Sequence, residues 1–324
     1  MSLPNVLWSG LMSTADASSY TIPFTSNSSL KTGFHLYAAL GGGSPHLFEV
    51  DTGSVGVLVP RKVLGPSYQD FDPAQDIQFQ YSSSGKVYSG QWVSLPVVLG
   101  VPVDWDGTGD YPTALVEVFA VDQPMQFDGG MLGIGFAIGG TADGGPLRNP
   151  LLRLNFQGTA LSAGYIVRTT SIEVGLTSTN LAGFAFIGLE RNAAGTDWAQ
   201  PLGSLGLPGG ILVKLPVLID TGVGSMLLWL DVSDRPPSLA KYTQFPAGIA
   251  VSIAAPPADG GAEPALQYSF VTGEASQPIA PAQVEWRNGH GINTGRSVLA
   301  GFDYLYDAVG GRIGFRTLAA NNDD

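Results

Sequence analysis

The stretch Leu47-Phe48-Glu49-Val50-Asp51-Thr52-Gly53 is an apolar run that ends in an acid on a tight turn, and the chain repeats this pattern once. The second copy is Leu215-Pro216-Val217-Leu218-Ile219-Asp220-Thr221-Gly222. A buried strand that ends on a Thr-Gly turn presents its carboxylate at a fixed point, so two such units can bring Asp51 and Asp220 face to face. Two facing carboxylates cannot both ionise cheaply and therefore share a proton. Such a pair can deprotonate a water molecule and protonate a leaving group in one site.

Composition indicates a globular all-β chain of about two domains. The 324 residues are 44% apolar and only 13% charged, with 44 glycines and 23 prolines. This length can bury a large core. Many turns and few charged helix faces favour strands over helices. The formal net charge of −12 argues against nucleic-acid binding, because phosphates would be repelled.

Several other classes of protein do not fit the sequence. No segment is long enough to span a membrane, and no signal peptide stands at the start of the chain as given. There is no cysteine, which leaves the compartment open; a secreted or periplasmic location is favoured. The three histidines are far apart and do not form a metal site. Neither a phosphate-binding loop nor a Gly-x-Ser-x-Gly nucleophile turn is present.

Strand patterns recur along the first half of the chain. Residues 77–81 alternate apolar and polar side chains, and a Ser/Gly turn joins them to residues 86–93, which predicts a β-hairpin. Residues 114–121 form another predicted strand. The best helix signal is at residues 149–156, where Asn149 is a cap, a proline follows it and Gly158 lies just past the end.

The second half repeats the plan of the first. Residues 164–172 look like the strand that connects the halves, and residues 183–188 precede the run into the second acid. This arrangement indicates an old internal duplication with one acid in each lobe. We expect an N-terminal lobe over residues 1–168 and a C-terminal lobe over residues 169–324.

With these motifs in order, the chain resembles the pepsin-like aspartic proteases over nearly all of its length. The resemblance implies a two-lobed double-barrel fold, with few short helices and an active-site cleft between the lobes. The lack of cysteine is more similar to the bacterial branch of the family. Five segments carry the resemblance: Phe48–Ser54 with Leu58–Pro60, Phe127–Gly135, the hairpin around Tyr81, Val217–Gly222, and Tyr306–Asp307 with Arg312–Phe315.

The resemblance also implies roles for individual residues. Asp51 and Asp220 would be the catalytic pair, and Thr52 and Thr221 would hydrogen-bond across the lobes. Gly53 and Gly222 would let backbone amides approach the carboxylates. Ser54 would donate a hydrogen bond to the outer oxygen of Asp51. Tyr81 and Gly85 would lie in a flap that covers the substrate.

The alternative for Tyr81 is a tyrosine on the face of an ordinary hairpin, without a role in a flap.

The sequence also departs from the family pattern near the flap. Leu58 stands where the family has a Trp that can pair with the flap tyrosine, and leucine has no hydrogen-bond donor.

The second acid departs from the family pattern. Val223 stands where the family has Ser or Thr, so Asp220 is expected to lack a hydroxyl partner, with Ser225 as a candidate replacement. A missing donor would raise the pKa of the pair and extend activity toward neutral pH. The usual apolar pair before the glycine of the second closing segment is also replaced, by the polar residues Asn293 and Thr294.

The function expected from this resemblance is that of an aspartic endopeptidase. It would hydrolyse an extended polypeptide without metal, cofactor or acyl-enzyme, and it would act as a monomer because both acids lie in one chain. Nucleic acid and membrane are not expected partners. The alternative is a pepsin-like module that binds a peptide or protein without cutting it, because fold alone does not decide activity.

Overall fold

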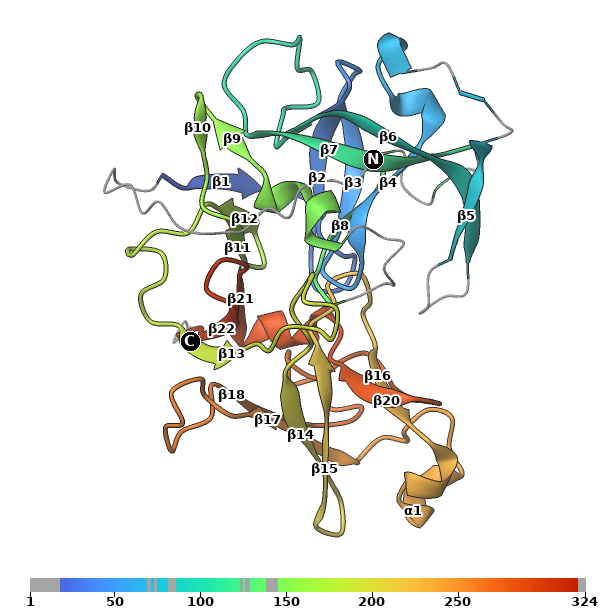
Figure 1. Ribbon diagram of the computed structural model, residues 1–324. Coiled ribbons are helices and arrows are strands. Elements are labelled where there is room, and N and C mark those ends of the chain that lie inside the picture. The colour runs from blue at the N-terminus through green and yellow to red at the C-terminus, as the bar shows by residue number, and fades with distance from the viewer. Residues whose placement is uncertain are drawn as a thin grey trace.

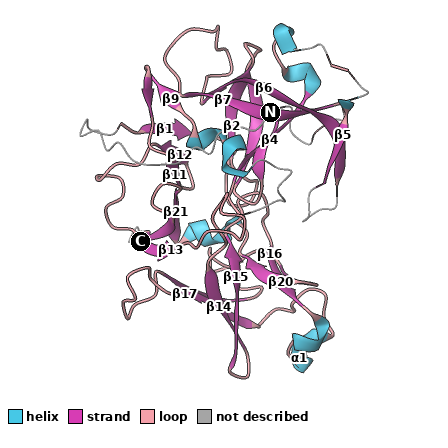
Figure 2. Ribbon diagram, in the orientation of Figure 1, coloured by secondary structure: helices cyan, strands magenta, loops and turns pink. Residues whose placement is uncertain are grey.

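The computed structural model describes residues 18–68, 71–72, 75–80, 86–122, 125, 129–137 and 145–319. It consists of two β-lobes and a sheet that joins them, so the expected all-β, two-lobed fold is confirmed (Figure 1). Helical structure is limited to short pieces, drawn in cyan in Figure 2. In the described ranges these are α1 (Pro237–Ala240) and the 3-10 turns η1 (Arg61–Val63), η2 (Pro66–Tyr68), η5 (Gly145–Arg148), η6 (Pro150–Leu152), η7 (Val232–Asp234) and η8 (Arg296–Ala300).

The N-terminal lobe is a sheet that closes on itself, because β6 pairs with both β2 and β7. Its β4 is buried along its whole length, as expected for an apolar run without alternation. The predicted hairpin is present as β5 paired with β6. In spatial order the strands are β10 (Thr159–Ala160), β9 (Asn155–Phe156), β7 (Thr113–Val121), β4 (Val55–Pro60), β8 (Gly130–Ile134), β3 (His46–Asp51), β2 (His35–Leu40), β6 (Val87–Leu99) and β5 (Ile77–Gln80).

The C-terminal lobe is a second sheet, in the lower half of Figure 1. Its hydrogen-bonded order is β18 (Leu266–Val271), β17 (Ala250–Ala255), β14 (Leu202–Leu207), β15 (Ile211–Leu218), β20 (His290–Asn293), β16 (Met226–Leu230) and β19 (Val284–Arg287).

Both lobes contain the same three-strand unit. In the N-terminal lobe β8 runs parallel to β3, which ends at Asp51, and antiparallel to β4. In the C-terminal lobe β20 runs parallel to β15, which leads to Asp220, and antiparallel to β16. In each lobe the Asp-Thr-Gly loop therefore joins two strands that flank a third. This repeated unit is the structural form of the duplication seen in the sequence.

A third sheet lies between the lobes and contains segments from both ends of the chain. The predicted boundary at Arg168 falls between two of its strands, β11 and β12, which pair with each other. The division of the chain at this residue stays a prediction. The sheet order is β1 (Tyr20–Pro23), β12 (Ser171–Val174), β11 (Gly164–Val167), β21 (Phe302–Asp307), β22 (Arg312–Thr317) and β13 (Ala185–Gly188).

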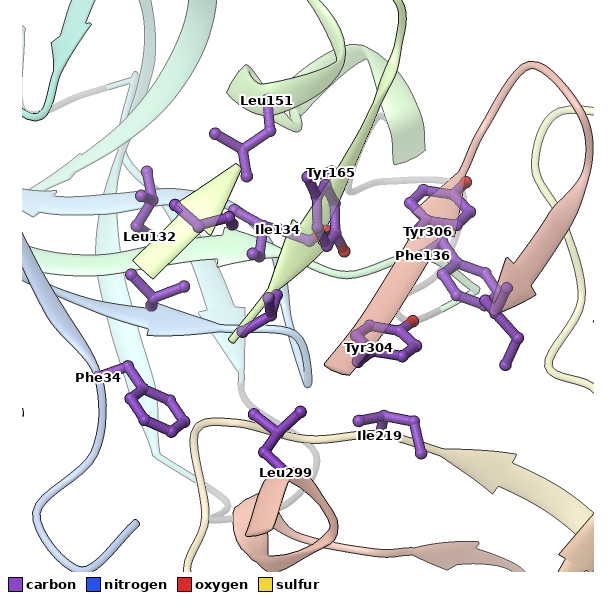
Figure 3. Close-up of a cluster of buried hydrophobic side chains, with 14 of the residues drawn as sticks. Phe34, Leu132, Ile134, Phe136, Leu151, Tyr165, Ile219, Leu299, Tyr304 and Tyr306 are labelled. Carbon is purple, nitrogen blue, oxygen red and sulfur yellow. Dashed lines mark hydrogen bonds between the residues drawn. The ribbon is translucent and has the colours of Figure 1, made fainter. Parts of the chain in front are cut away.

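The core is continuous from one lobe to the other. Figure 3 shows Ile134, from the N-terminal lobe, and Ile219, from the loop of the second acid, with side chains of the joining sheet. The Tyr165 hydroxyl donates to the Ile134 carbonyl at 2.6 Å, and the rings of Phe136 and Tyr306 stack at 4.4 Å. This packing connects the joining sheet to the residue that precedes the second acid, Ile219.

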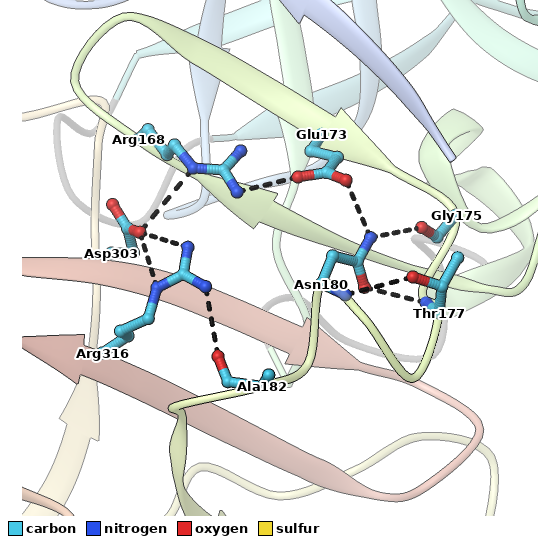
Figure 4. Close-up of polar contacts among 8 residues, drawn as sticks. All are labelled: Arg168, Glu173, Gly175, Thr177, Asn180, Ala182, Asp303 and Arg316. Carbon is cyan, nitrogen blue, oxygen red and sulfur yellow. Dashed lines mark hydrogen bonds and ion pairs between the residues drawn. The ribbon is translucent and has the colours of Figure 1, made fainter. Parts of the chain in front are cut away.

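One face of the joining sheet carries a network of charged side chains (Figure 4). Asp303 accepts hydrogen bonds from Arg316 Nη2 at 2.6 Å and Nε at 3.1 Å. Arg168 donates to Glu173 at 2.7 Å and lies 3.6 Å from Asp303. Asn180 donates to the other oxygen of Glu173 at 2.9 Å. The network links β11 and β12 to β21 and β22.

The helix predicted at residues 149–156 is wrong. Asn149 does cap a turn, since its side chain accepts from the Leu151 amide at 3.0 Å, but that turn is the short η6. The chain then forms the hairpin β9–β10. Its two-residue turn has φ of 51° at Gln157 and 80° at Gly158, and such left-handed pairs favour a hairpin over a helix.

Candidate active site

The two Asp-Thr-Gly loops meet where the lobes join, and each carboxyl group faces the opposite loop. A Cβ atom added at Gly53 would lie 2.2 Å from Asp220 Cγ, and one added at Gly222 would lie 2.5 Å from Asp51 Oδ1. Both acids are buried, at 6% and 4% exposure. Glycine is therefore required in both loops, because any side chain would collide with the facing carboxyl group.

Four short hydrogen bonds cross between the loops through two threonines, in addition to a longer contact of 3.5 Å between the two hydroxyl groups. The backbone N–H of Thr52 donates to Thr221 Oγ1 at 3.0 Å, and that of Thr221 donates to Thr52 Oγ1 at 2.9 Å. The Thr52 hydroxyl donates to the Ile219 carbonyl, and the Thr221 hydroxyl to the Val50 carbonyl, both at 2.7 Å. The cross-lobe contact expected for these threonines is present, and it holds the two acids in a fixed relation.

Each oxygen of Asp51 accepts a hydrogen bond from its own loop. The Gly53 N–H donates to Oδ1 at 2.6 Å, and the Ser54 hydroxyl donates to Oδ2 at 2.6 Å. These are the contacts expected from the sequence for Gly53 and Ser54. They leave Asp51 with donors on both oxygens.

Asp220 has the same number of donors, but one comes from a distant strand. The Gly222 N–H donates to Oδ1 at 2.8 Å. Asn293, at the end of β20, donates from Nδ2 to Oδ2 at 2.5 Å. As expected, no hydroxyl group bonds Asp220 among the described residues, but a side-chain amide takes the place of the missing hydroxyl. In the part of the chain that the structure describes, Ser225 makes no hydrogen bond to Asp220.

The pKa of Asp220 is raised well above its usual range. Burial is the largest cause, the charge of Asp51 is next, and the hydrogen bond between the two carboxyl groups also raises it. The bonds from Asn293 and the Gly222 amide act in the opposite direction, because they favour the charged form. The pair is thus arranged to retain a proton where an isolated aspartate would have lost it.

Charged residues also lie beneath the pair. A Cβ atom at Gly33 would stand 2.7 Å from Arg296 Nη1 and 3.0 Å from Glu49 Oε1, so both groups lie under this glycine. Arg296 donates to the Gly222 carbonyl at 3.1 Å. Burial and the charge of Asp51 raise the pKa of Glu49 to about 7, against the opposing effect of Arg296. Sequence analysis missed Glu49 and Arg296. Glu49 has a recognisable signal, since it is a charged residue inside an apolar run, whereas Arg296 lies among polar and small residues.

Two of the predicted site residues cannot be placed. Tyr81 and Gly85, the expected flap residues, lie outside the described residues. The strands that lead to them, β5 and β6, are paired in register from Ile77↔Gly90 to Gln80↔Val87.

Leu58 belongs to an apolar cluster on the adjacent strands. Its side chain is 2% exposed and packs in a cluster with Phe119, Trp92 and Met131. The rings of Trp92 and Phe119 lie 5.0 Å apart. Leu58 thus has an apolar environment in which a hydrogen-bond donor is not needed.

The described residues contain no group of three or more His, Cys, Asp or Glu side chains that could hold a metal ion. Within the same ranges, no helix is long and apolar enough to cross a membrane.

The fold is similar to that of proteins whose structures have been solved. Among the solved structures that match is the crystal structure of the aspartic proteinase from Irpex lacteus, with a TM-score of 0.56 and 13% sequence identity. The match covers 94% of this chain and 99% of that one. No protein-family model and no curated protein matches the sequence. The structural likeness shows a pepsin-like fold for the whole chain.

Proposed function

We propose that this chain is an aspartic endopeptidase, with Asp51 and Asp220 as its catalytic pair. The observation that carries the proposal is the placement of two buried carboxyl groups face to face, with backbone and side-chain donors on all four oxygens. The fold of the aspartic proteinase from Irpex lacteus supports it. A pair held this rigidly is preorganised for proton transfer.

In the proposed reaction a water molecule between the two acids attacks the scissile carbonyl carbon. One carboxylate takes the proton of the water while the other, protonated, donates to the carbonyl oxygen. The resulting geminal diol collapses when the first carboxyl group gives its proton to the amide nitrogen, a diol hydroxyl returns its proton to the second carboxylate, and the C–N bond breaks. The pair ends with one shared proton, as it began, so no acyl-enzyme forms and no other group is consumed.

The proposed substrate is an extended polypeptide. Such a chain can bind by backbone hydrogen bonds, as an added strand does. Trp92 and Met131, which are partly buried and pack against the cluster around Leu58, favour apolar side chains beside the cut. Both acids come from one chain, so the proposed enzyme acts as a monomer.

The sequence alternative, a binding module without activity, depended on Val223 and Leu58. The donor from Asn293 to Asp220 removes the first reason, and the burial of Leu58 among apolar side chains weakens the second. The structure therefore favours the enzyme over the module.

Digestion of a denatured protein at a series of pH values, read by mass spectrometry, tests the proposal. We expect cleavage in acid, internal to the substrate chain and blocked by a hydroxyl-containing peptide that mimics the diol. A double variant with both acids changed to Asn is the control for contaminating protease. Cleavage that persists in the double variant, or none at any pH with the folded wild-type chain, would contradict the proposal.

A further inference from the structure

We infer that Asn293 is a positioning residue for the reaction: its amide keeps the outer oxygen of Asp220 unprotonated and so confines the proton of the pair to the side that faces Asp51. The outer oxygen is Oδ2, which Asn293 contacts, and the inner one is Oδ1. This inference rests on the proposed function for its catalytic meaning, but the contact itself is a property of the folded chain.

The orientation of the Asn293 amide is set by the backbone. Its Oδ1 accepts a hydrogen bond from the Gly295 N–H at 2.9 Å, and a backbone N–H can only donate. Nδ2 must therefore point to Asp220, and an amide nitrogen can also only donate. With the side chain 1% exposed, no water competes for this position.

The donor favours an unprotonated Oδ2, because a carboxylate oxygen is a stronger acceptor than a carboxylic O–H. Oδ1 also accepts from a group that can only donate, the Gly222 N–H, but at 2.8 Å against 2.5 Å for Asn293 at Oδ2. The shorter contact at Oδ2 therefore leaves the proton of Asp220 with Oδ1. That oxygen faces the other acid: a Cβ atom added at Gly222 would lie 3.1 Å from Asp220 Oδ1 and 2.5 Å from Asp51 Oδ1.

The two halves of the site differ in this respect. The outer oxygen of Asp51 is bonded to the Ser54 hydroxyl, which can rotate and act as donor or acceptor. The outer oxygen of Asp220 is bonded to a group that can only donate. The position three residues after Asp220, which would match Ser54, is Val223 and has no hydroxyl group.

Among the described residues, five titratable or charged groups lie around this pair of acids, and one of them is Tyr165 on β11, which interacts with Asp51. Asp51 faces Asp220 from the opposite loop, and Glu49 lies behind Asp51 on β3. Arg296, at the start of η8, acts on all three acids, and His35 on β2 lies close to Arg296. Asn293 is neutral, so a change to an apolar residue of similar size removes the donor without altering this set of charges.

The experiment compares four variants with the wild type. Asn293→Leu removes the donor, and Asn293→Asp keeps the shape while adding an acid. Val223→Thr combined with Asn293→Leu supplies a hydroxyl at the position equivalent to Ser54. Thr294→Val is the matched control, since Thr294 is also buried in this segment but its hydroxyl donates to the Gly295 carbonyl and not to an acid.

Two measurements are made on each protein: the carbon-13 NMR titration of the aspartate carboxyl groups, and the basic limb of kcat/KM against pH. In Asn293→Leu both midpoints should rise by about one pH unit, the value of one hydrogen bond to a charged group. KM should change less than kcat. The double variant should return toward wild type, and Thr294→Val should not shift.

Asn293→Asp should raise the midpoints further, because a third carboxyl group opposes ionisation, and it reports on the contact if Asn293→Leu does not fold. Midpoints that stay or fall in the folded Asn293 variants, or that rise equally in Thr294→Val, would overturn the inference. If the wild type cleaves nothing while the NMR midpoints shift as expected, the proposed function fails and the assignment of Asn293 to Asp220 stands.

Discussion

Thr52 and Thr221 are bonded to each other reciprocally: the backbone N–H of each donates to the hydroxyl group of the other, at 3.0 and 2.9 Å. Each hydroxyl in turn donates a hydrogen bond to a backbone carbonyl of the opposite lobe, Thr52 to Ile219 and Thr221 to Val50, both at 2.7 Å. Both threonines are almost fully buried. The two lobes thus meet through a contact in which both threonine N–H groups and both threonine hydroxyl groups have partners.

Thr221→Val should destabilise the protein strongly. The valine has the same shape but leaves the Thr52 N–H and the Val50 carbonyl buried without partners, at a cost of roughly 2–5 kcal/mol in the free energy of unfolding. Denaturant unfolding measures this cost. Thr221→Ser, which keeps the hydroxyl, is the control and should lose far less; equal losses in the two variants would show that the methyl group and not the bonds supplies the stability.

Asp51→Asn and Asp220→Asn should each abolish cleavage while the fold remains. The amide keeps the shape of the acid but removes the shared proton, and the rate should fall by roughly 10³ or more. Because a repulsion between carboxyl groups is also removed, the thermal midpoint at neutral pH should not fall. The control is Asp104→Asn, at an exposed position; near-normal turnover in either active-site variant argues against the mechanism.

Glu49 should make the protein more stable in acid than at neutral pH. Its pKa rises from an ordinary 4.5 to about 7 in the folded chain. Between these values the folded state binds more protons than the unfolded state, so the free energy of unfolding falls as pH rises. The contribution is fully present below about 4.5 and is lost on passing through about 7; it amounts to about 3 kcal/mol.

Glu49→Gln cannot titrate and should lack this contribution. The difference in unfolding free energy between the variant and the wild type should therefore change by about 3 kcal/mol between roughly pH 4 and pH 8, in favour of the variant at the higher pH. Glu190→Gln, at an exposed position, is the control. A constant difference across the range would mean that Glu49 does not titrate there.

Asp303→Asn should weaken the joining sheet. Asp303 is 5% exposed and receives two hydrogen bonds from Arg316, with Arg168 at 3.6 Å. Removal of its charge leaves two arginines facing each other, which should lower the free energy of unfolding by about 2–3 kcal/mol. The loss is smaller than for a fully buried pair because both arginines are partly exposed. Denaturant unfolding measures this loss in the free energy of unfolding, with Glu190→Gln as the reference. An unchanged free energy of unfolding in Asp303→Asn would show that solvent screens the network.

The acids and their threonines were predictable because their signal is local and duplicated. A strand, an acid and a Thr-Gly turn are contiguous in the sequence, and the second copy supports the first. The predicted strands and the hairpin β5–β6 follow from short-range patterns of the same kind. The joining sheet was less accessible to sequence analysis, because it pairs β1 near the start of the chain with β12 and places β21 and β22 beside them.

Asn293 could not be recognised from the sequence as the partner of Asp220. A polar residue where the family has an apolar one indicates a departure, but only the register Leu218↔Asn293 shows that it lies beside the strand of the second acid. The false helix at residues 149–156 has a different cause. The cap at Asn149 is real, but the apolar residues after it pack into the core and the turn at Gln157 and Gly158 reverses the chain.

The donors on the outer oxygens also differ in how far along the chain they lie from their acids. Ser54 is 3 residues from Asp51, so its bond can form as soon as the turn closes. Asn293 is 73 residues from Asp220, and its bond requires β20 to be seated between β15 and β16. Closing so long a loop carries an entropic cost before the contact is made. During folding, the hydrogen bond from Asn293 to Asp220 should therefore form later than the bond from Ser54 to Asp51. A local opening of β20 would remove the donor from Asp220 and leave the donor of Asp51 in place.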